Sequence, residues 1–333
     1  MFNYSDVTVE SLRKDLDNTI SECKELIKDL KASSEVKLNN FNDMESMIYD
    51  LSGRVAFLGD VHPDEKIRDF GNEADSKIQN FALEIFNDSG LYEKYNDIDI
   101  LNLDEEDLSF HKDLGLDFKD AGHGLSAEKK ERLIEIEKKL IELGISFSEN
   151  IAKDKTELMF LENELKGLSQ NELQNLRKEG SNFVITMAYP DINAVSENCS
   201  VRKTREVVWK AFNNRSVKEN SPILEEAVVL RNEKAKLFGF NTWSEYRLQN
   251  RMAKGPSNVS SMYEELIPKL QKAAGKEKDE LVIDNIKIND IAPWDIRYFV
   301  SAERAKVSNV ENSELKKYFY IHDVKNEMFK VCE

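Results

Sequence analysis

The sequence predicts a mainly α-helical protein with a very small β component. Apolar residues recur at steps of three and four residues through most of the chain, which is the spacing of one face of a helix. The 333 residues include only six prolines and thirteen glycines, fewer than the turn-rich sequence of a sandwich or barrel requires. Apolar residues make up 40% of the chain, which is enough for a sizeable core in two domains or in one large helical domain.

The N-terminal part of the chain predicts antiparallel helices that pack on one another. Thr8 is a typical helix-capping residue, and an apolar stripe follows it. A second apolar run begins after the polar residues Ser33 and Ser34, and a third helix is expected to begin near Asp64. The apolar positions of these three runs are Leu12, Leu16, Ile20, Cys23, Ile27, Leu30, Phe41, Met44, Met47, Ile48, Leu51, Ile67, Phe70, Ala74, Ile78, Phe81 and Ile85.

The rest of the chain predicts further helices and one strand. Ser126 is expected to cap a long helix, and residues 183–188 are the one convincing strand because they are short and rich in β-branched residues. Asn220 or Ser221 is expected to cap another helix with Pro222 in its first turn. Gly239 then suits the left-handed conformation that ends a helix.

Composition and charge exclude several classes of function. The net charge is -16, with acidic and basic residues interspersed, so the phosphates of a nucleic acid would be repelled. No apolar run is long enough to span a bilayer, and the N-terminus lacks the apolar core of a signal peptide. The three cysteines, Cys23, Cys199 and Cys332, are odd in number and have no CxxC spacing, which favours a reducing compartment, by default the cytoplasm.

A series of motifs at fixed spacings lies between residues 205 and 253. They are Arg205 before a long helix, Asn220-Ser221-Pro222-Ile223-Leu224, Leu230-Arg231-x-Glu233-x-Ala235-x-Leu237-x-Gly239-Phe240, and Tyr246 with Arg251-Met252-Ala253. This region resembles the thimet oligopeptidase family, the saccharolysin and neurolysin group of zinc metallopeptidases. The segment Trp294-Asp295-Ile296-Arg297-Tyr298-Phe299 resembles a further segment of that family.

The resemblance implies a neurolysin-like fold in which two helical lobes flank a deep channel that admits short peptides. Residues 1–155 would form the N-terminal helical lobe, and residues 156–333 would begin the catalytic-lobe region. The family's reaction is zinc-assisted hydrolysis, with HExxH on one helix because histidines four residues apart reach the same metal. The resemblance places that helix beyond residue 333, so the fold would be truncated before the zinc-binding helix.

The four histidines of the chain do not form this motif. His62 precedes Pro63, His111 precedes Lys112, His123 precedes Gly124 and His322 precedes Asp323, so none is followed by a glutamate. No catalytic residue and no metal ligand of the family can therefore be assigned to this sequence. Zinc is expected in the full-length family, and none is expected on this chain alone.

Three hypotheses about the function of the chain remain open. The chain is the N-terminal half of a zinc oligopeptidase that is inactive in isolation, or a non-catalytic helical peptide-binding or scaffold protein derived from such an enzyme. In the third hypothesis a separate chain supplies the catalytic half and the two assemble. Short peptides are the expected ligands in each case.

The best candidate for a functional surface is the cluster Trp294, Asp295, Arg297 and Tyr298. One interpretation is an aromatic helix face whose Asp–Arg pair supports packing. The other is that these residues form part of the wall of the peptide channel.

Overall fold

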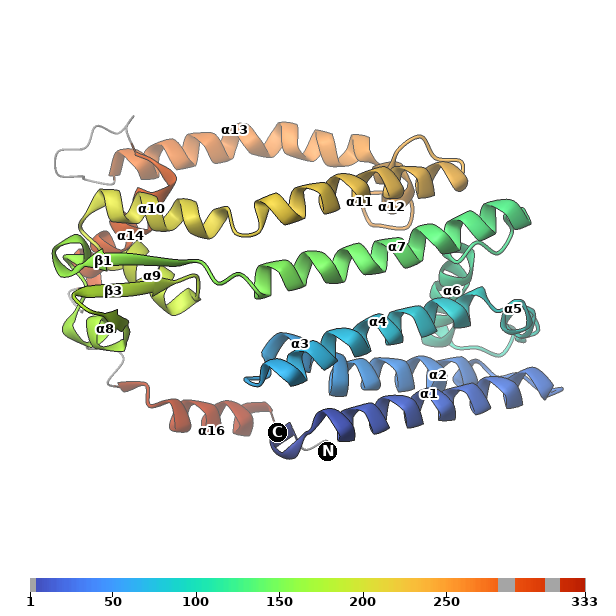
Figure 1. The fold of residues 1–333 in the computed structure, drawn as a ribbon. Helices are drawn as coiled ribbons and strands as arrows, with labels where there is room; N and C mark the ends of the chain where they lie inside the picture. The colour runs from blue at the N-terminus through green and yellow to red at the C-terminus, as the bar shows by residue number, and fades with distance from the viewer. Residues whose placement is uncertain (1–3, 281–290, 309–317, 333) are drawn as a thin grey trace. The chain divides into compact units, whose positions relative to one another are not determined.

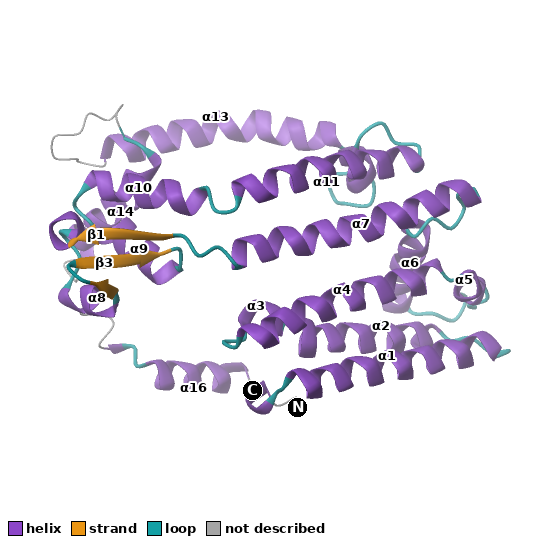
Figure 2. Cartoon of the chain, viewed as in Figure 1, coloured by secondary structure: helices purple, strands orange, loops and turns teal. Residues whose placement is uncertain are grey.

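The computed structural model describes residues 4–280, 291–308 and 318–332. Most of these residues are helical and one small sheet accompanies them (Figure 2), which confirms the mainly α-helical prediction. Within the described ranges, every helix is too short or too polar to cross a membrane. The backbone forms two compact units: unit 1 is Met1–Asn150 with Lys218–Pro256, and unit 2 is Ile151–Val217 with Ser257–Glu333. The assignment of residues 1–155 and 156–333 to two lobes of a larger fold stays a prediction.

Unit 1 is built from helices (Figure 1). They are α1 (Val9–Ala32), α2 (Leu38–Leu51), α3 (Leu58–Val61), α4 (Glu65–Asn87), α5 (Ser89–Asn96), α6 (Glu105–Asp120), most of α7 (Ala127–Ala152), most of α11 (Val217–Leu237), and α12 (Trp243–Leu248). The predicted cap of α1 is confirmed, because Thr8 Oγ1 accepts a hydrogen bond from the Ser11 N–H at 3.1 Å. The predicted start near Asp64 is confirmed too, because its carboxylate accepts from the Lys66 N–H at 2.9 Å.

Apolar stripes from different helices form the core of unit 1. One cluster joins the first half of α1 to α4, and another joins its second half to α2, α4, α5 and α6. Phe118 of α6 is fully buried in the second cluster, and its ring contacts those of Phe41, Phe86, Tyr92, Tyr95 and His123. A third cluster pairs Ile136 and Leu143 of α7 with Ala227 and Leu230 of α11.

The predicted start of α11 at Asn220 or Ser221 is wrong. The helix begins at Val217, directly after Ser216, which has a positive φ of 51°. Asn220 lies inside the helix and is buried, and its side-chain amide donates to the Phe147 carbonyl at 3.0 Å. It uses its hydrogen bonds to join α11 to α7 rather than to cap α11. The predicted end is correct, since Gly239 follows the helix with a φ of 84°.

Unit 2 contains the sheet. Its elements are β1 (Glu157–Leu161), α8 (Gln170–Asn175), β2 (Arg177–Glu179), β3 (Asn182–Thr186), α9 (Tyr189–Asn198), α10 (Arg202–Asn213), nearly all of α13 (Pro256–Glu280), α14 (Pro293–Ser308) and α16 (Ile321–Cys332). The strands are antiparallel in the order β1-β3-β2, with Phe160 opposite Phe183 and Lys178 opposite Phe183. The predicted strand at residues 183–188 is β3; β1 and β2 were not predicted.

The sheet packs on α9 and α10. Phe183 and Ile185 of β3 lie in one buried cluster with Ile192 and Val195 of α9 and Val208 of α10. This packing fixes α10, whose arginines reach the candidate site.

Candidate functional site

The candidate site is the start of α14, which carries Trp294, Asp295, Arg297 and Tyr298. The Asp295 carboxylate accepts a hydrogen bond from the Ala292 N–H at 3.0 Å, and the Asp295 N–H donates to the Ala292 carbonyl at 2.9 Å. Both bonds close a tight local loop, so the chain enters α14 in one fixed conformation.

The Asp295 side chain is fully buried between α14 and α10. Arg202 Nε lies 3.1 Å from Oδ1 and 3.0 Å from Oδ2, and its Nη2 donates to Oδ2 at 2.8 Å. Arg205 Nη2 donates to Oδ1 at 2.8 Å. Because the two arginines are three residues apart, they lie on one face of α10. Two guanidinium groups therefore hold one buried carboxylate.

Arg205 is buried almost as deeply as its partner, with 2% of its side chain exposed. Its Nη1 donates to the Cys199 carbonyl at 2.7 Å, and its Nε donates to the Trp294 carbonyl at 3.2 Å. The guanidinium carbon lies 4.2 Å from the centroid of the Tyr298 ring, a cation–π distance. The planar donors of arginine suit this divided arrangement, which lysine could not reproduce.

These partners set the ionisation of Asp295. Burial alone would raise the pKa of its carboxyl, but hydrogen bonds from Arg202, Arg205 and the Ala292 N–H outweigh burial and lower the pKa below its usual range. Asp295 is therefore a stable anion in the folded protein. It has no proton to donate near neutral pH.

The other predicted residues form the outer part of the cluster. The Trp294 ring meets the Trp209 ring edge to face at 5.8 Å, and Lys210 Nζ lies 5.2 Å from its centroid. Arg297 is exposed and its Nη1 donates to Asn193 Oδ1 of α9. Trp294 and Tyr298 are half-buried. The accessible groups of the site are thus the arginines Arg202 and Arg297 and parts of the two half-buried aromatic rings.

This arrangement suits binding rather than covalent chemistry. Asp295 has no exposed surface, so no ligand reaches its carboxylate without displacing an arginine. Its evident function is to fix α14 against α10. The exposed Arg297 and the aromatic edges offer charge and apolar area to a ligand.

All four histidines lie in the described residues, and each has a local environment of its own. His62 Nδ1 accepts from the Asp64 N–H at 3.0 Å, and His123 Nε2 lies 2.8 Å from the Phe86 carbonyl oxygen. The His111 ring stacks on Tyr95 at 4.5 Å, and the ring of His322, in the first turn of α16, lies near that of Tyr320, which precedes the helix. The described part of the chain brings together no group of three His, Cys, Asp or Glu residues suited to a metal. These residues do not fit a zinc site.

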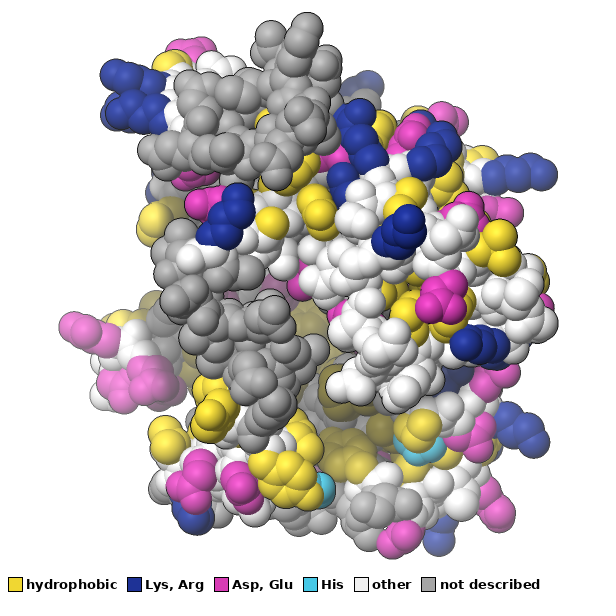
Figure 3. Space-filling view, turned by 90° about the vertical axis from the view of Figure 1, so that its left-hand side faces the viewer, with side chains coloured by type: hydrophobic (Ala, Val, Ile, Leu, Met, Phe, Trp, Pro, Cys, Tyr) yellow, Lys and Arg dark blue, Asp and Glu magenta, His cyan; other side chains and the backbone are white. Residues whose placement is uncertain are grey.

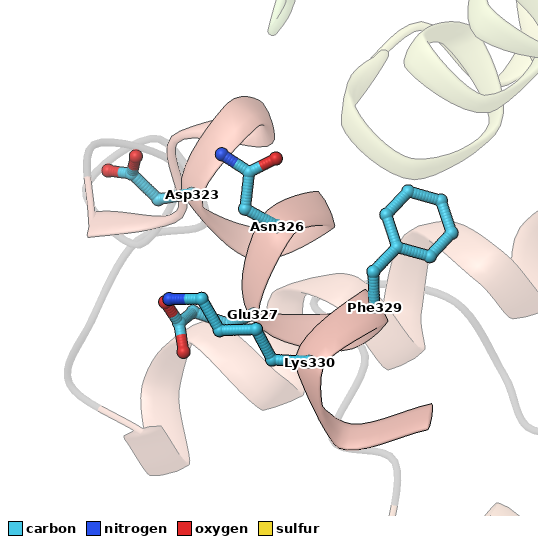
Figure 4. A pocket seen from close by; sticks show the side chains of 5 residues that line it. All are labelled: Asp323, Asn326, Glu327, Phe329 and Lys330. Atoms are coloured by element: carbon cyan, nitrogen blue, oxygen red, sulfur yellow. The ribbon is translucent and has the colours of Figure 1, made fainter. Parts of the chain in front are cut away.

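Two surface hollows are each lined by the residues of a single helix. One, of about 390 Å³, is lined among the described residues by Asp323, Asn326, Glu327, Phe329 and Lys330, all of α16 (Figure 4). Its Lys330 and Glu327 form an ion pair at 2.6 Å. The other, of about 420 Å³, is lined by residues of α7. Charges of both signs mix with hydrophobic side chains on the face in Figure 3. Neither hollow brings together side chains from separate elements, so neither is a built site.

Residues 195–333, which include α10 and α14, match the model of peptidase family M3. Over 93% of its length the chain is 29% identical to the thimet-like oligopeptidase of Dictyostelium discoideum, and it covers 49% of that protein. The chain is therefore similar to members of peptidase family M3.

The chain covers other relatives to a similar extent. It is 25% identical to oligopeptidase A of Haemophilus influenzae, over 99% of the chain and 52% of that protein. It is 26% identical to saccharolysin of Saccharomyces cerevisiae, over 88% of the chain and 44% of that protein. The chain therefore spans about half the length of the curated relatives it matches.

The structure adds residues that sequence reasoning did not place in the site. Arg202 and Arg205 were visible as an i, i+3 pair, but their partner lies about ninety residues further along the chain. Asn193 and Trp209 gave no signal. Whether Trp294, Asp295, Arg297 and Tyr298 face a peptide channel stays a prediction.

Proposed function

We propose that this chain is the N-terminal part of a zinc-dependent oligopeptidase, a metalloendopeptidase that cleaves short peptides. The observation that carries the proposal is its alignment, nearly end to end, with about half of a thimet-like oligopeptidase. The zinc ligands and catalytic residues would be supplied by polypeptide outside residues 1–333. The isolated chain would then be inactive.

We assign α14 a supporting function in that enzyme. Asp295 would position the helix through Arg202 and Arg205, and Arg297 with the edges of Trp294 and Tyr298 would contact a peptide in the channel. A guanidinium group suits the carboxylates and carbonyls of a peptide, and aromatic edges suit its apolar side chains. Residues 1–155 and 156–333 would contribute to different lobes of the complete fold.

We place the protein in the cytoplasm. Cys23, Cys199 and Cys332 are all unpaired thiols, which suits a reducing compartment. Because two of the three are buried, their pairing would require unfolding.

A chimera tests the proposed function. Residues 1–333 replace the matched half of the Dictyostelium thimet-like oligopeptidase, and bound zinc and cleavage of a short quenched-fluorescent peptide are measured. We expect chelator-sensitive cleavage by the chimera and none by residues 1–333 alone. In the chimera, Arg297→Ala should raise KM by about 10-fold with little change in kcat, because a lost charged contact is worth about 1.4 kcal/mol. Lys203→Ala, an exposed cation of α10, is the matched control and should leave both constants unchanged.

Three outcomes would contradict parts of this proposal. Stoichiometric zinc with cleavage by residues 1–333 alone would refute the conclusion that the four histidines of this chain form no zinc site. A chimera that binds peptides without cleaving them would support the alternative, a non-catalytic helical peptide-binding or scaffold protein. Equal KM values for Arg297→Ala and the control would remove α14 from the channel wall.

A further inference from the structure

Helix α13 carries a long apolar stripe. Val259, Tyr263, Leu266, Leu270 and Ala273 follow one another at alternating steps of four and three residues, the spacing with which one helix packs along another. Met262 and Ile267 widen the stripe. The opposite side of the helix is polar, with Ser261, Glu264, Gln271 and Lys272.

This stripe is exposed from Tyr263 to Ala273, and Val259 at its start is half-buried. The exposed fractions are 53% for Met262, 50% for Tyr263, 39% for Leu266, 45% for Ile267 and 55% for Leu270. Single exposed apolar residues are normal on a protein surface, but a continuous row of them marks an interaction surface. Among residues 256–277 of α13, no side chain is buried.

A second helix of unit 2 has the same character. Ile321, Val324, Met328 and Val331 of α16 follow at steps of three and four residues and are exposed. Both helices lie within residues 195–333, the part of the chain that matches the family model. Since both stripes are exposed, neither covers the other.

We propose that the α13 stripe, defined as Val259, Tyr263, Leu266, Leu270 and Ala273, receives an amphipathic helix from the polypeptide that corresponds to the remaining half of the M3 relatives. This inference rests on the proposed function. The relatives supply the occupant, because the chain covers only 49% to 53% of the Dictyostelium and bacterial proteins that it matches over at least 93% of its own length. Because the apolar residues of the stripe recur at alternating steps of four and three, it packs best against another helix whose apolar residues recur at the same spacing.

A second copy of the chain is a poorer occupant. Each chain carries a net charge of -16, so two copies repel each other. At the border of the stripe, Lys269 and Glu265 form an ion pair in which the two charges cancel.

Binding between separate chains tests the inference. The probe is the part of the Dictyostelium thimet-like oligopeptidase beyond its match to residues 1–333, produced alone, and its affinity for the 333-residue chain is measured by calorimetry. The double variant Leu266→Glu with Leu270→Glu places two charges in the stripe. It should weaken binding by at least about 100-fold, because burial of each leucine contributes about tenfold or more.

The control is Ser261→Glu with Gln271→Glu, which adds the same two charges to the polar side of α13. It should bind within about threefold of the unchanged chain, and circular dichroism should show equal helix content in both variants. Equal weakening by the two variants would overturn the proposal, as would no binding by the unchanged chain. A stripe-dependent dimer in sedimentation would assign the stripe to a second copy instead. Neither result would alter cleavage by the covalent chimera, which tests the function separately.

Discussion

Helices α1 and α13 have the same apolar spacing and opposite surroundings. In α1 of unit 1, Leu12, Leu16 and Cys23 recur at helical spacing and are almost completely buried. In α13 of unit 2, Leu266 and Leu270 follow the same rule and are exposed. Periodicity therefore predicts that a helix is amphipathic, and the presence of a complementary surface decides whether its stripe is covered.

The largest loss of stability is expected from a substitution in the core of unit 1, where the apolar helix stripes are buried. Phe118→Ala should reduce the free energy of unfolding of the chain by about 3–5 kcal/mol, because it removes a fully buried ring and leaves a cavity among five aromatic neighbours. Urea unfolding followed by circular dichroism measures this loss. Tyr49→Ala is the control, since Tyr49 lies in the same unit with 81% of its surface exposed, and it should cost less than about 0.5 kcal/mol. Similar losses in both variants would mean that the Phe118 cluster is loosely packed.

A smaller effect is expected at the buried ion pair of unit 2. Asp295→Asn should reduce stability by about 2–3 kcal/mol at pH 7, because it leaves the buried Arg205 without its anion while keeping most of the packing. The loss should be read from urea unfolding with Asp323→Asn, on the exposed surface of α16, as the control.

The same variant has a defined pH dependence. The pKa of Asp295 is lowered in the folded protein, so its contribution is present above the ordinary value of 3.8 and is lost as the pH falls through the folded pKa. The difference between Asp295→Asn and the unchanged chain should therefore shrink below about pH 4. A constant difference from pH 7 to pH 3 would show that the carboxylate charge is not what holds α14.

The smallest effect is expected on the exposed stripe. Leu266→Ala with Leu270→Ala should change the stability of the isolated chain by less than about 0.5 kcal/mol, because neither side chain is buried and alanine is a good helix former. Leu16→Ala in α1 is the matched control and should cost about 2–5 kcal/mol in the same urea experiment. A loss above about 1 kcal/mol in α13 would mean that residues of this chain already cover the stripe.

Local signals in the sequence predicted most of the fold. Thr8, Asp64 and Gly239 mark helix boundaries through their own backbone or side-chain preferences, and each was placed correctly. The prediction that Asn220 caps α11 was wrong because its side-chain amide donates a hydrogen bond to α7 instead of capping the N-terminus of α11. The strand β2 has only exposed polar residues, so it carries no alternation of apolar and polar positions to detect.

The candidate site was predictable only in part. The residues of α14 were identified from their resemblance to a family segment, but the partners of Asp295 were not. Arg202 and Arg205 meet Asp295 only after the sheet has positioned α10. A contact between residues about ninety positions apart is set by tertiary packing, which no local pattern encodes.

Unit 1 is assembled from two separate stretches of the chain, and this imposes an order on its synthesis. Helix α7 leaves the ribosome well before α11 exists, because the strands and helices between them belong to unit 2. The side chains of Ile136 and Leu143 therefore lack their packing partners Ala227 and Leu230 until α11 has been synthesised. The nascent protein carries this unfinished surface until translation has passed α11.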